Sequence, residues 1–181
     1  MTPRAAFLLI LLALATPARG TVLIPADLGE LSHDAHAIVR GRIVAVDARW
    51  ADDHHSIETI VTVQAERYLK GAWGPTVQFR VPGGELGRFR SIFVGAPEFA
   101  VDERIVVFLG TRGPTMPYLI GFGQGVYRVA RTADQAWVVT PPPLYPSANA
   151  TTRVVRGDTA RRPVALADFE DRVRSLAGGV Q

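Results

Sequence analysis

The main pattern along the chain is an alternation of apolar and polar residues, which is typical of β-strands. In segment 38–46, apolar positions alternate with Arg40 and Arg42, and β-branched residues are frequent. Segments 57–69 and 76–81 alternate in the same way, with polar turns or Gly-Pro punctuation between the segments. We therefore predict three strands here, of which the first two form a hairpin.

The pattern downstream predicts further strands. Residues 104–109 form an almost continuous apolar run, which predicts a central strand buried on both faces. Segments 118–122 and 125–129 predict the next strand pair, with glycines at which a barrel strand bulges or bends. Residues 135–139 predict a last short strand. Residues 84–100 are less regular but rich in large apolar residues, so we expect a folded excursion there.

Two short helices are predicted at the ends of this β-rich region. Leu28, Leu31 and Ala35 are spaced for one or two helical turns before the first strand. In 166–177, apolar residues recur at steps of three and four, and acidic residues precede arginines, as in a short helix. Between the last strand and this helix, the proline-rich segment 141–163 predicts an extended surface connection.

The first 20 residues have the pattern of a secretory signal peptide. Arg4 supplies a positive charge, residues 5–15 are all apolar, and small residues follow. This run is shorter than the roughly 20 residues that span a bilayer as a helix, and no cysteine follows it for lipid attachment. We predict cleavage after Gly20, with Ala18 as the competing site, and a periplasmic or secreted protein without a membrane anchor after processing.

The composition of the chain excludes several kinds of site and partner. The chain has no cysteine, so disulfides, thiolate metal sites and a cysteine nucleophile are excluded. Of its 20 basic residues, Arg4 and Arg19 leave with the signal peptide, against 17 acidic residues, so the mature charge is close to neutral. Because the arginines are scattered, we predict no nucleic-acid binding. Residues 21–181 are long enough for one domain with its own core.

Several short segments carry a resemblance to known modules. Residues 36–46, then 65–71 with its Lys-Gly turn, then 77–79 resemble the netrin-like module of the OB-fold type. This is the module of the amino-terminal domain of tissue inhibitors of metalloproteinases. Through 93–99 and 103–109 the chain also resembles a group of uncharacterised exported bacterial proteins.

Pattern and resemblance together predict a mainly β fold: one partly closed OB/netrin-like barrel in residues 21–181, with a short N-terminal helix and a C-terminal helix. In the inhibitors, the α-amine and carbonyl of the first mature residue chelate the zinc of the protease. The resemblance implies that Thr21 does so here and that Val22 enters the specificity pocket. Leu23 and Ile24 would follow along the cleft. The alternative is that residues 21–24 form an apolar segment that packs on the barrel, because no disulfide fixes this segment in place.

Metal and catalytic motifs are incomplete. His33 and His36 lie one helical turn apart, and residues 52–55 join two carboxylates to two imidazoles. Neither matches a zinc-ligand spacing or completes a tetrahedral set, so we assign no metal, cofactor or catalytic residue; capping and surface roles are the alternative. The acid and base of an envelope hydrolase would have to come from three isolated carboxylates, namely Glu85, Glu98 and Glu103.

Three phenylalanines in the excursion, Phe89, Phe93 and Phe99, have two interpretations. They form a loop surface that contacts a ligand, as loops of OB-type barrels do, or they plug the open end of the barrel. We predict an exported binding module without enzymatic activity, whose partner is an unknown protein. Inhibition of a secreted zinc metalloprotease through the mature N-terminus, and an envelope hydrolase, are the alternatives.

Overall fold

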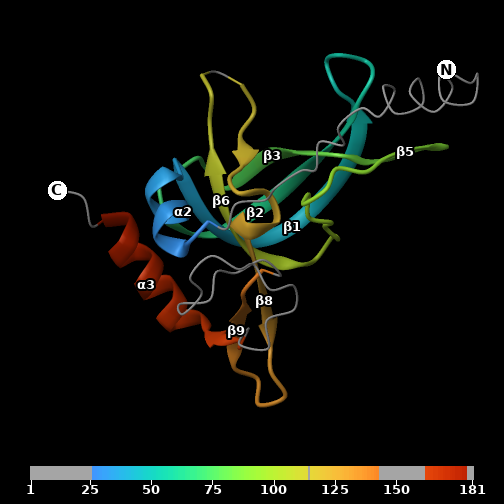
Figure 1. Cartoon of the computed structure of the whole chain (residues 1–181). Helices are drawn as coiled ribbons and strands as arrows, with labels where there is room; N and C mark the ends of the chain where they lie inside the picture. Colours follow the sequence, from blue (N-terminus) through green and yellow to red (C-terminus); the bar gives the residue numbers. More distant parts are fainter. Residues whose placement is uncertain (1–25, 114, 143–161, 179–181) are drawn as a thin grey trace, which may run out of the picture.

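The computed structural model describes residues 26–113, 115–142 and 162–178 (Figure 1). The predicted signal peptide and residues 143–161 of the proline-rich segment lie outside these ranges. The described chain is mainly β and contains a partly closed barrel, a short helix near its start and a C-terminal helix. This confirms the predicted fold class. Within the described ranges, no helix has the length and apolar character needed to cross a membrane.

Five strands form the barrel. They follow one another around the ring in the order β1-β2-β3-β7-β6, and β6 pairs back onto β1. Neighbouring strands are antiparallel except for β3 and β7, which are parallel and share a single residue pair, so closure is partial. The strands are β1 (Ala37–Trp50), β2 (Ile57–Lys70), β3 (Thr76–Pro82), β6 (Arg104–Gly110) and β7 (Tyr118–Leu119).

Strand β6 is buried on both faces, as its continuous apolar run predicts. The side chains of Ile105, Val107 and Leu109 belong to the core inside the barrel. Those of Val106 and Phe108 belong to a second core, which lies between the barrel and the two helices. Because successive strand residues point to opposite faces, one short strand supports both cores.

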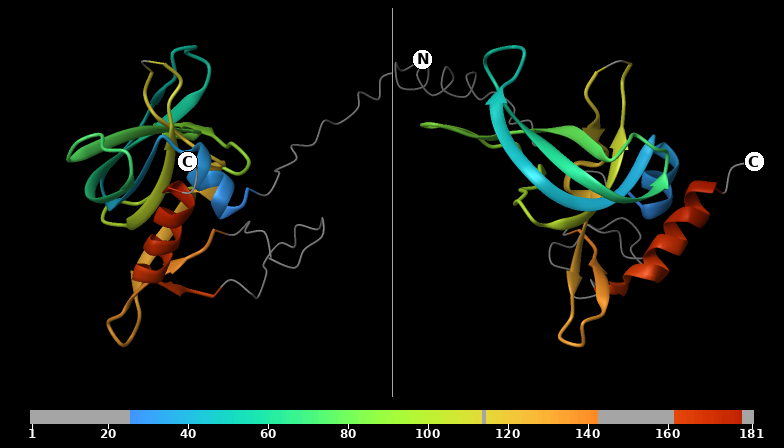
Figure 2. Two further views of the ribbon diagram at one scale, coloured as in Figure 1. Left: turned by 90° about the vertical axis from the view of Figure 1, so that its left-hand side faces the viewer. Right: turned by 180° about the vertical axis from the view of Figure 1, so that it is seen from behind.

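Helix α2 (Leu28–Asp34) precedes the barrel and confirms the predicted helical turns. Its first turn is closed by a capping box, in which the Asp27 side chain accepts from the Glu30 backbone N–H and the Glu30 side chain accepts from that of Asp27. Its apolar face packs against the outer side of the barrel beside α3 (Figure 2). The helix therefore starts where its sequence provides the cap.

The turn after β2 fixes α2 to the barrel. The Lys70 ammonium donates to the backbone carbonyls of Ser32 and His33, at 2.9 and 2.8 Å, in the last turn of α2. Gly71 has a φ of 68°, and a Cβ there would lie 2.6 Å from the His36 carbonyl oxygen. Position 71 therefore requires glycine. The Lys70-Gly71 turn therefore attaches helix α2 to the barrel.

Replacing Lys70 with methionine tests this docking. The substitution keeps the length of the side chain but removes the donor to two helix carbonyls, so we expect the free energy of unfolding to fall by about 1 kcal/mol. Urea unfolding followed by tryptophan fluorescence measures the change. An unchanged unfolding midpoint would show that water replaces the ammonium without loss.

Helix α3 (Leu166–Gly178) confirms the predicted C-terminal helix and packs on the outer core through Phe169 and Val173. One polar residue of this helix is buried with them: Glu170 is only 2% exposed. Its carboxylate accepts from the Arg40 guanidinium of β1 at 2.6 Å. The helix is thus held by apolar contacts and by a buried ion pair.

The region 118–129 differs from the predicted strand pair. Strand β7 ends at Leu119 and pairs with β3 and β6, not with the strand that follows it in sequence. The short 3-10 helix η1 (Phe122–Gly125) comes next, and β8 (Val126–Arg131) pairs with β6. Gly121 adopts a left-handed conformation, with φ of 66°, and turns the chain before η1. The glycines therefore build a helical turn where we predicted a bulged strand.

The predicted last strand is not the last. Strand β9 (Trp137–Thr140) pairs with β8, and a two-residue strand, β10 (Val164–Ala165), extends the sheet beyond it. Two residues are too few to produce a recognisable alternation. The pairing places the start of α3 directly beside the sheet, so β10 determines where the helix begins.

Candidate functional site

The excursion 83–103 crosses the open end of the barrel. It contains a small hairpin of two strands, β4 (Gly84–Leu86) and β5 (Phe89–Ser91). The hairpin is held on β2 at its base, where the Thr59 hydroxyl donates to the Gly83 carbonyl at 2.7 Å. The predicted folded excursion is thus a strand pair attached to the mouth of the barrel.

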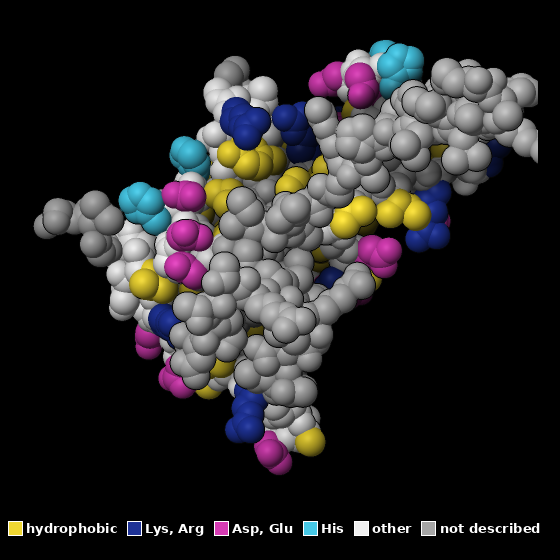
Figure 3. Space-filling model, viewed as in Figure 1, with side chains coloured by type: hydrophobic (Ala, Val, Ile, Leu, Met, Phe, Trp, Pro, Cys, Tyr) yellow, Lys and Arg dark blue, Asp and Glu magenta, His cyan; other side chains and the backbone are white. Residues whose placement is uncertain are grey.

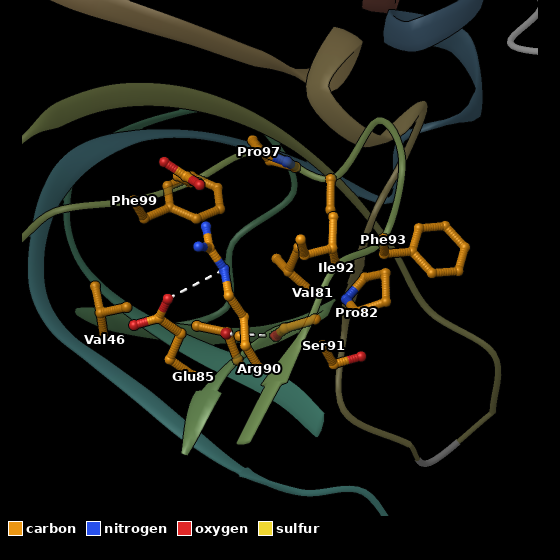
Figure 4. A pocket seen from close by; sticks show the side chains of 15 residues that line it. Val46, Val81, Pro82, Glu85, Arg90, Ser91, Ile92, Phe93, Pro97 and Phe99 are labelled. Atoms are coloured by element: carbon orange, nitrogen blue, oxygen red, sulfur yellow. Dashed lines mark hydrogen bonds and ion pairs between the residues drawn. The ribbon is translucent and has the colours of Figure 1, made fainter. Parts of the chain in front are cut away.

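A cleft of about 440 Å³ lies between this hairpin and the mouth of the barrel (Figure 4). The Arg90 side chain projects into it, and its Nε lies 3.1 Å from the Glu85 carboxylate on the neighbouring strand. The rest of the wall is mixed, and its polar side chains are those of Thr59, Ser91 and Glu98. The apolar side chains that line it include Val46, Val81, Pro82, Ile92 and Phe99. The cleft therefore combines apolar side chains with the Arg90–Glu85 ion pair and a third charged residue, Glu98.

Phe99 lies at the inner wall of the cleft. Its ring meets the fully buried ring of Phe79 edge-on, with 5.6 Å between the ring centroids. It also packs against the core inside the barrel. This position is the one expected of a plug that closes the barrel.

Phe89 and Phe93 have different surroundings from Phe99. Phe89 is 46% exposed and contacts Trp50 of β1, whereas Phe93 is 47% exposed and stacks on Phe122. Each ring has one aromatic neighbour, and the Arg88 guanidinium also lies over the Phe89 ring, 5.0 Å from its centroid. A ligand contact by these two residues stays a prediction, and their exposure is what such a contact requires.

The residues next to Phe93 extend this apolar surface. Ile92 is 77% exposed and Val94 is 64% exposed. Three consecutive large apolar side chains at the rim of a cleft are uncommon on a soluble surface, where apolar residues are usually scattered singly. The exposed stretch 92–94 and the cleft together form the candidate site.

Of the three carboxylates considered for hydrolysis, two lie at the cleft and one does not. Glu85 and Glu98 both line the cleft, and Glu85 is paired with Arg90. Glu103 lies elsewhere, in an ion pair with Arg128. Of the two carboxylates at the cleft, Glu85 is thus engaged by a guanidinium.

The histidines occupy two separate places, one beside α2 and one at the tip of the β1–β2 loop (Figure 3). All four are exposed. In the described part of the chain, no group of three or more His, Asp or Glu side chains is arranged to hold a metal ion. At the loop tip, the Asp53 carboxylate accepts from the backbone N–H groups of His55 and Ser56, both at 2.9 Å. The acidic residue of this cluster therefore stabilises the turn.

The same hydrogen bonds lower the pKa of Asp53 from 3.8 to about 2, led by the backbone N–H groups of His55 and Ser56 and followed by the Ser56 hydroxyl. A lowered pKa means that the carboxylate favours the ordered turn fully above pH 3.8, and that this contribution is lost as the pH falls through about 2. Carboxyl NMR titration should give a midpoint near 2 for Asp53, and Ser56→Ala should raise it. A midpoint near 3.8 in the unaltered protein would contradict the turn.

The sequence pattern predicted neither a role for Arg90 nor the hairpin that carries it. A signal for the hairpin is present: Gly87 follows Leu86, precedes Arg88 and Phe89, and has a φ of 60°, as a glycine has in the first central position of a two-residue hairpin turn. The flanking strands have only three residues each, so no alternation of apolar and polar residues marks the hairpin. Thr21, Val22, Leu23 and Ile24, implied by the inhibitor resemblance, lie outside the described residues.

No family model, curated protein or solved structure matches the chain. The geometry of the cleft and the residues around it are therefore the basis for a function.

Proposed function

We propose that the protein is an exported binding module without enzymatic activity, which contacts a protein partner through the cleft and the apolar stretch 92–94. The observation that carries this proposal is the exposure of Ile92 and Val94, at 77% and 64%, beside a cleft that contains several apolar side chains. Exposed apolar surface next to a concave site is what a partner covers. Burying it contributes roughly 25 cal/mol per Å² of apolar area.

The composition of the cleft indicates the kind of group that enters it. Its wall has apolar side chains beside polar ones, and its one guanidinium belongs to an ion pair in which the Arg90 and Glu85 side chains are 61% and 67% exposed. An apolar side chain of the partner would fill the wall, and the ion pair would supply polar contacts at the rim. A buried apolar centre with a polar rim is the common anatomy of protein interfaces.

The strand order supports a barrel of the OB type. Five strands close the ring, and one of the five pairings is parallel, between β3 and β7. Such partly open five-stranded barrels bind partners on one face and through their loops. The fold is compatible with many functions, so the proposal depends on the cleft and not on the fold alone.

Site-specific photocrosslinking in the cells that produce the protein tests the proposal. A photoreactive amino acid at position 92 should give one discrete adduct with another protein. The matched control carries the same group in place of Val164, an exposed valine of β10 that does not line the cleft. A discrete adduct at position 92 but not at position 164 supports the proposed site. No adduct with another protein, or equal adducts at both positions, would contradict it.

Export is part of the same proposal. It is supported by the charged start, the apolar run 5–15 and the small residues that end at Gly20. Mass spectrometry of the protein recovered from the producing cells should show a chain that begins at Thr21. A cytosolic chain that still carries Met1 would contradict export.

Inhibition of a secreted zinc metalloprotease is a second candidate function, and one contact favours it. Although no disulfide is present, the chain is fixed to the barrel immediately after the implied inhibitory segment: the Ala26 N–H donates to the Gln124 side chain at 2.8 Å. The capped helix α2 follows. An anchor of this kind lowers the ordering entropy that a mobile N-terminus would lose on binding.

The inhibitor proposal has a sharp control at the N-terminus. The chain beginning at Thr21 should inhibit at least one member of a panel of secreted zinc proteases at micromolar concentration. A variant with one additional alanine before Thr21 should not inhibit it, because the chelating amine is displaced. Full protease activity with both forms would remove this candidate.

A further inference from the structure

We infer that the chain pairs with a second copy of itself through the outer edge of β5, around a two-fold axis at Ser91. Within the described structure, β5 pairs with β4 alone and forms a separate two-stranded sheet. Its outer edge is therefore open to another strand. Phe89, Phe93 and the intervening Arg90 and Ile92 are all exposed.

The sequence of this edge lacks the usual protection against strand pairing. Natural proteins block open edges with prolines, bulges or several charges. Residues 89–94 read Phe-Arg-Ser-Ile-Phe-Val, with a single charge and neither proline nor glycine. Short segments of this composition pair readily with other strands. A self-complementary edge is also what a two-fold dimer needs, because the same surface must serve on both subunits.

The turn of the hairpin determines which backbone groups point outward. Leu86 and Phe89 face each other across a two-residue turn, and in such a hairpin the closing pair exchanges hydrogen bonds. The backbone groups of Ser91, two residues further along, then also point toward β4. Those of Arg90 and Ile92 point to the open edge. The edge therefore offers two residues for pairing, on either side of Ser91.

This geometry selects the register. With the axis at Ser91, Arg90 of each chain lies opposite Ile92 of the second copy, and the two pairs form four hydrogen bonds. Phe89 then lies opposite Phe93 of the second copy, so both half-exposed rings gain an aromatic neighbour. With the axis at Arg90, two guanidinium groups would oppose each other, which is unfavourable.

Side-chain directions agree with the Ser91 register. Figure 4 shows the side chains of Arg90 and Ile92 on the cleft side, and those of Ser91 and Phe93 on the other side. Each Arg90 keeps Glu85 of its own chain, 3.1 Å away, so pairing buries no charge without a partner. On one face of the paired strands, Phe89 and Phe93 of the two copies lie side by side. On the other face, the charge of each Arg90 is neutralised by Glu85.

A single cysteine provides a direct test, because the chain has none of its own. In the Ser91 register the two Ser91 residues form a non-hydrogen-bonded pair with Cα atoms about 4.5 Å apart, which lies within the range that a disulfide spans. Ser91→Cys should therefore form a disulfide-linked dimer under mild oxidation at least about tenfold faster than Ser175→Cys, an exposed serine on α3. Equal rates for the two variants would overturn the inference.

Sedimentation velocity on the unaltered protein provides the second measurement. The dimer fraction should rise with concentration, and Phe93→Ser should raise the dissociation constant about tenfold, because it removes both cross-strand aromatic pairs. Val164→Ser, on an exposed valine of β10, should leave the constant unchanged. Melting curves establish that each variant is folded. A protein that is monomeric at every concentration would overturn the dimer and leave the adduct with another protein at position 92 as a separate question.

Discussion

Replacing Phe99 with alanine is expected to lower the free energy of unfolding by about 3 kcal/mol. The ring of Phe99 meets the buried ring of Phe79 and closes the inner core of the barrel at its open end. Truncation therefore removes an aromatic contact and opens a cavity above Phe79, and both effects destabilise the fold. Urea unfolding monitored by tryptophan fluorescence measures the loss.

Phe93→Ala is the matched control for this prediction. The Phe93 ring is 47% exposed and has one stacking neighbour, Phe122, so its truncation should lower the free energy of unfolding by about 1 kcal/mol or less. The same variant should weaken any contact made at the rim of the cleft. Equal losses of stability for Phe93→Ala and Phe99→Ala would show that both rings serve the core, and would count against the proposed binding surface.

Replacing Glu170 with alanine is expected to lower the free energy of unfolding by about 3 kcal/mol. The carboxylate is almost fully buried and lies 2.6 Å from Arg40, 3.1 Å from Arg67 and 3.4 Å from Arg174. Its removal leaves the partly buried Arg40 guanidinium without its closest acidic partner. Breaking one side of a buried ion pair is more damaging than replacing the whole pair by apolar residues. Arg40 would keep only the longer contact with Glu66, 3.4 Å from its Nε.

Asp171→Ala is the control for the buried ion pair. Asp171 is the next residue of α3 and also pairs with Arg174, at 2.7 Å, but its side chain is 70% exposed. Solvent screens such a pair, so the loss should be within about 1 kcal/mol. If Glu170→Ala unfolds at the same urea concentration as Asp171→Ala, then α3 is held by its apolar face alone.

These two predictions divide the molecule into a fixed part and an exposed part. Phe99 belongs to the inner core and Glu170 fastens the C-terminal helix to β1, so both maintain the frame around the cleft. The stretch 92–94 and the β5 edge make few such contacts and remain exposed. Substitutions in the exposed part should change association while lowering the free energy of unfolding by about 1 kcal/mol or less, and this separation makes the binding proposals testable.

The sequence was sufficient for the long strands and for both helices. Alternation over nine or more residues predicted β1 and β2, and the continuous apolar run predicted the doubly buried β6. It was less informative where a strand is very short: β7 and β10 have two residues each, so the strand predicted over 118–122 was too long and β10 was not predicted. The hairpin of β4 and β5 was not predicted because each of its strands has only three residues, although the glycine of its turn, Gly87, was a usable signal.

Only part of the candidate site could be predicted from the sequence. The concentration of phenylalanines in residues 84–100 predicted a folded, apolar excursion, but their different roles depend on distant contacts. Phe99 contacts Phe79 of β3, whereas Phe93 stacks on Phe122, which is 29 positions further along the chain. Arg90 has no special sequence context, and it becomes notable only because the hairpin turns it into the cleft.

What the sequence alone determined is the class of each long element and the face that it buries, because side-chain direction repeats every two residues in a strand and every 3.6 in a helix. What only the tertiary structure decided is which edges meet: the parallel contact of β3 with β7, the return of β6 to β1, and the ion pair between Arg40 and Glu170. The members of that ion pair are 130 residues apart. Such contacts depend on the closure of the barrel as a whole, and no local pattern carries that information.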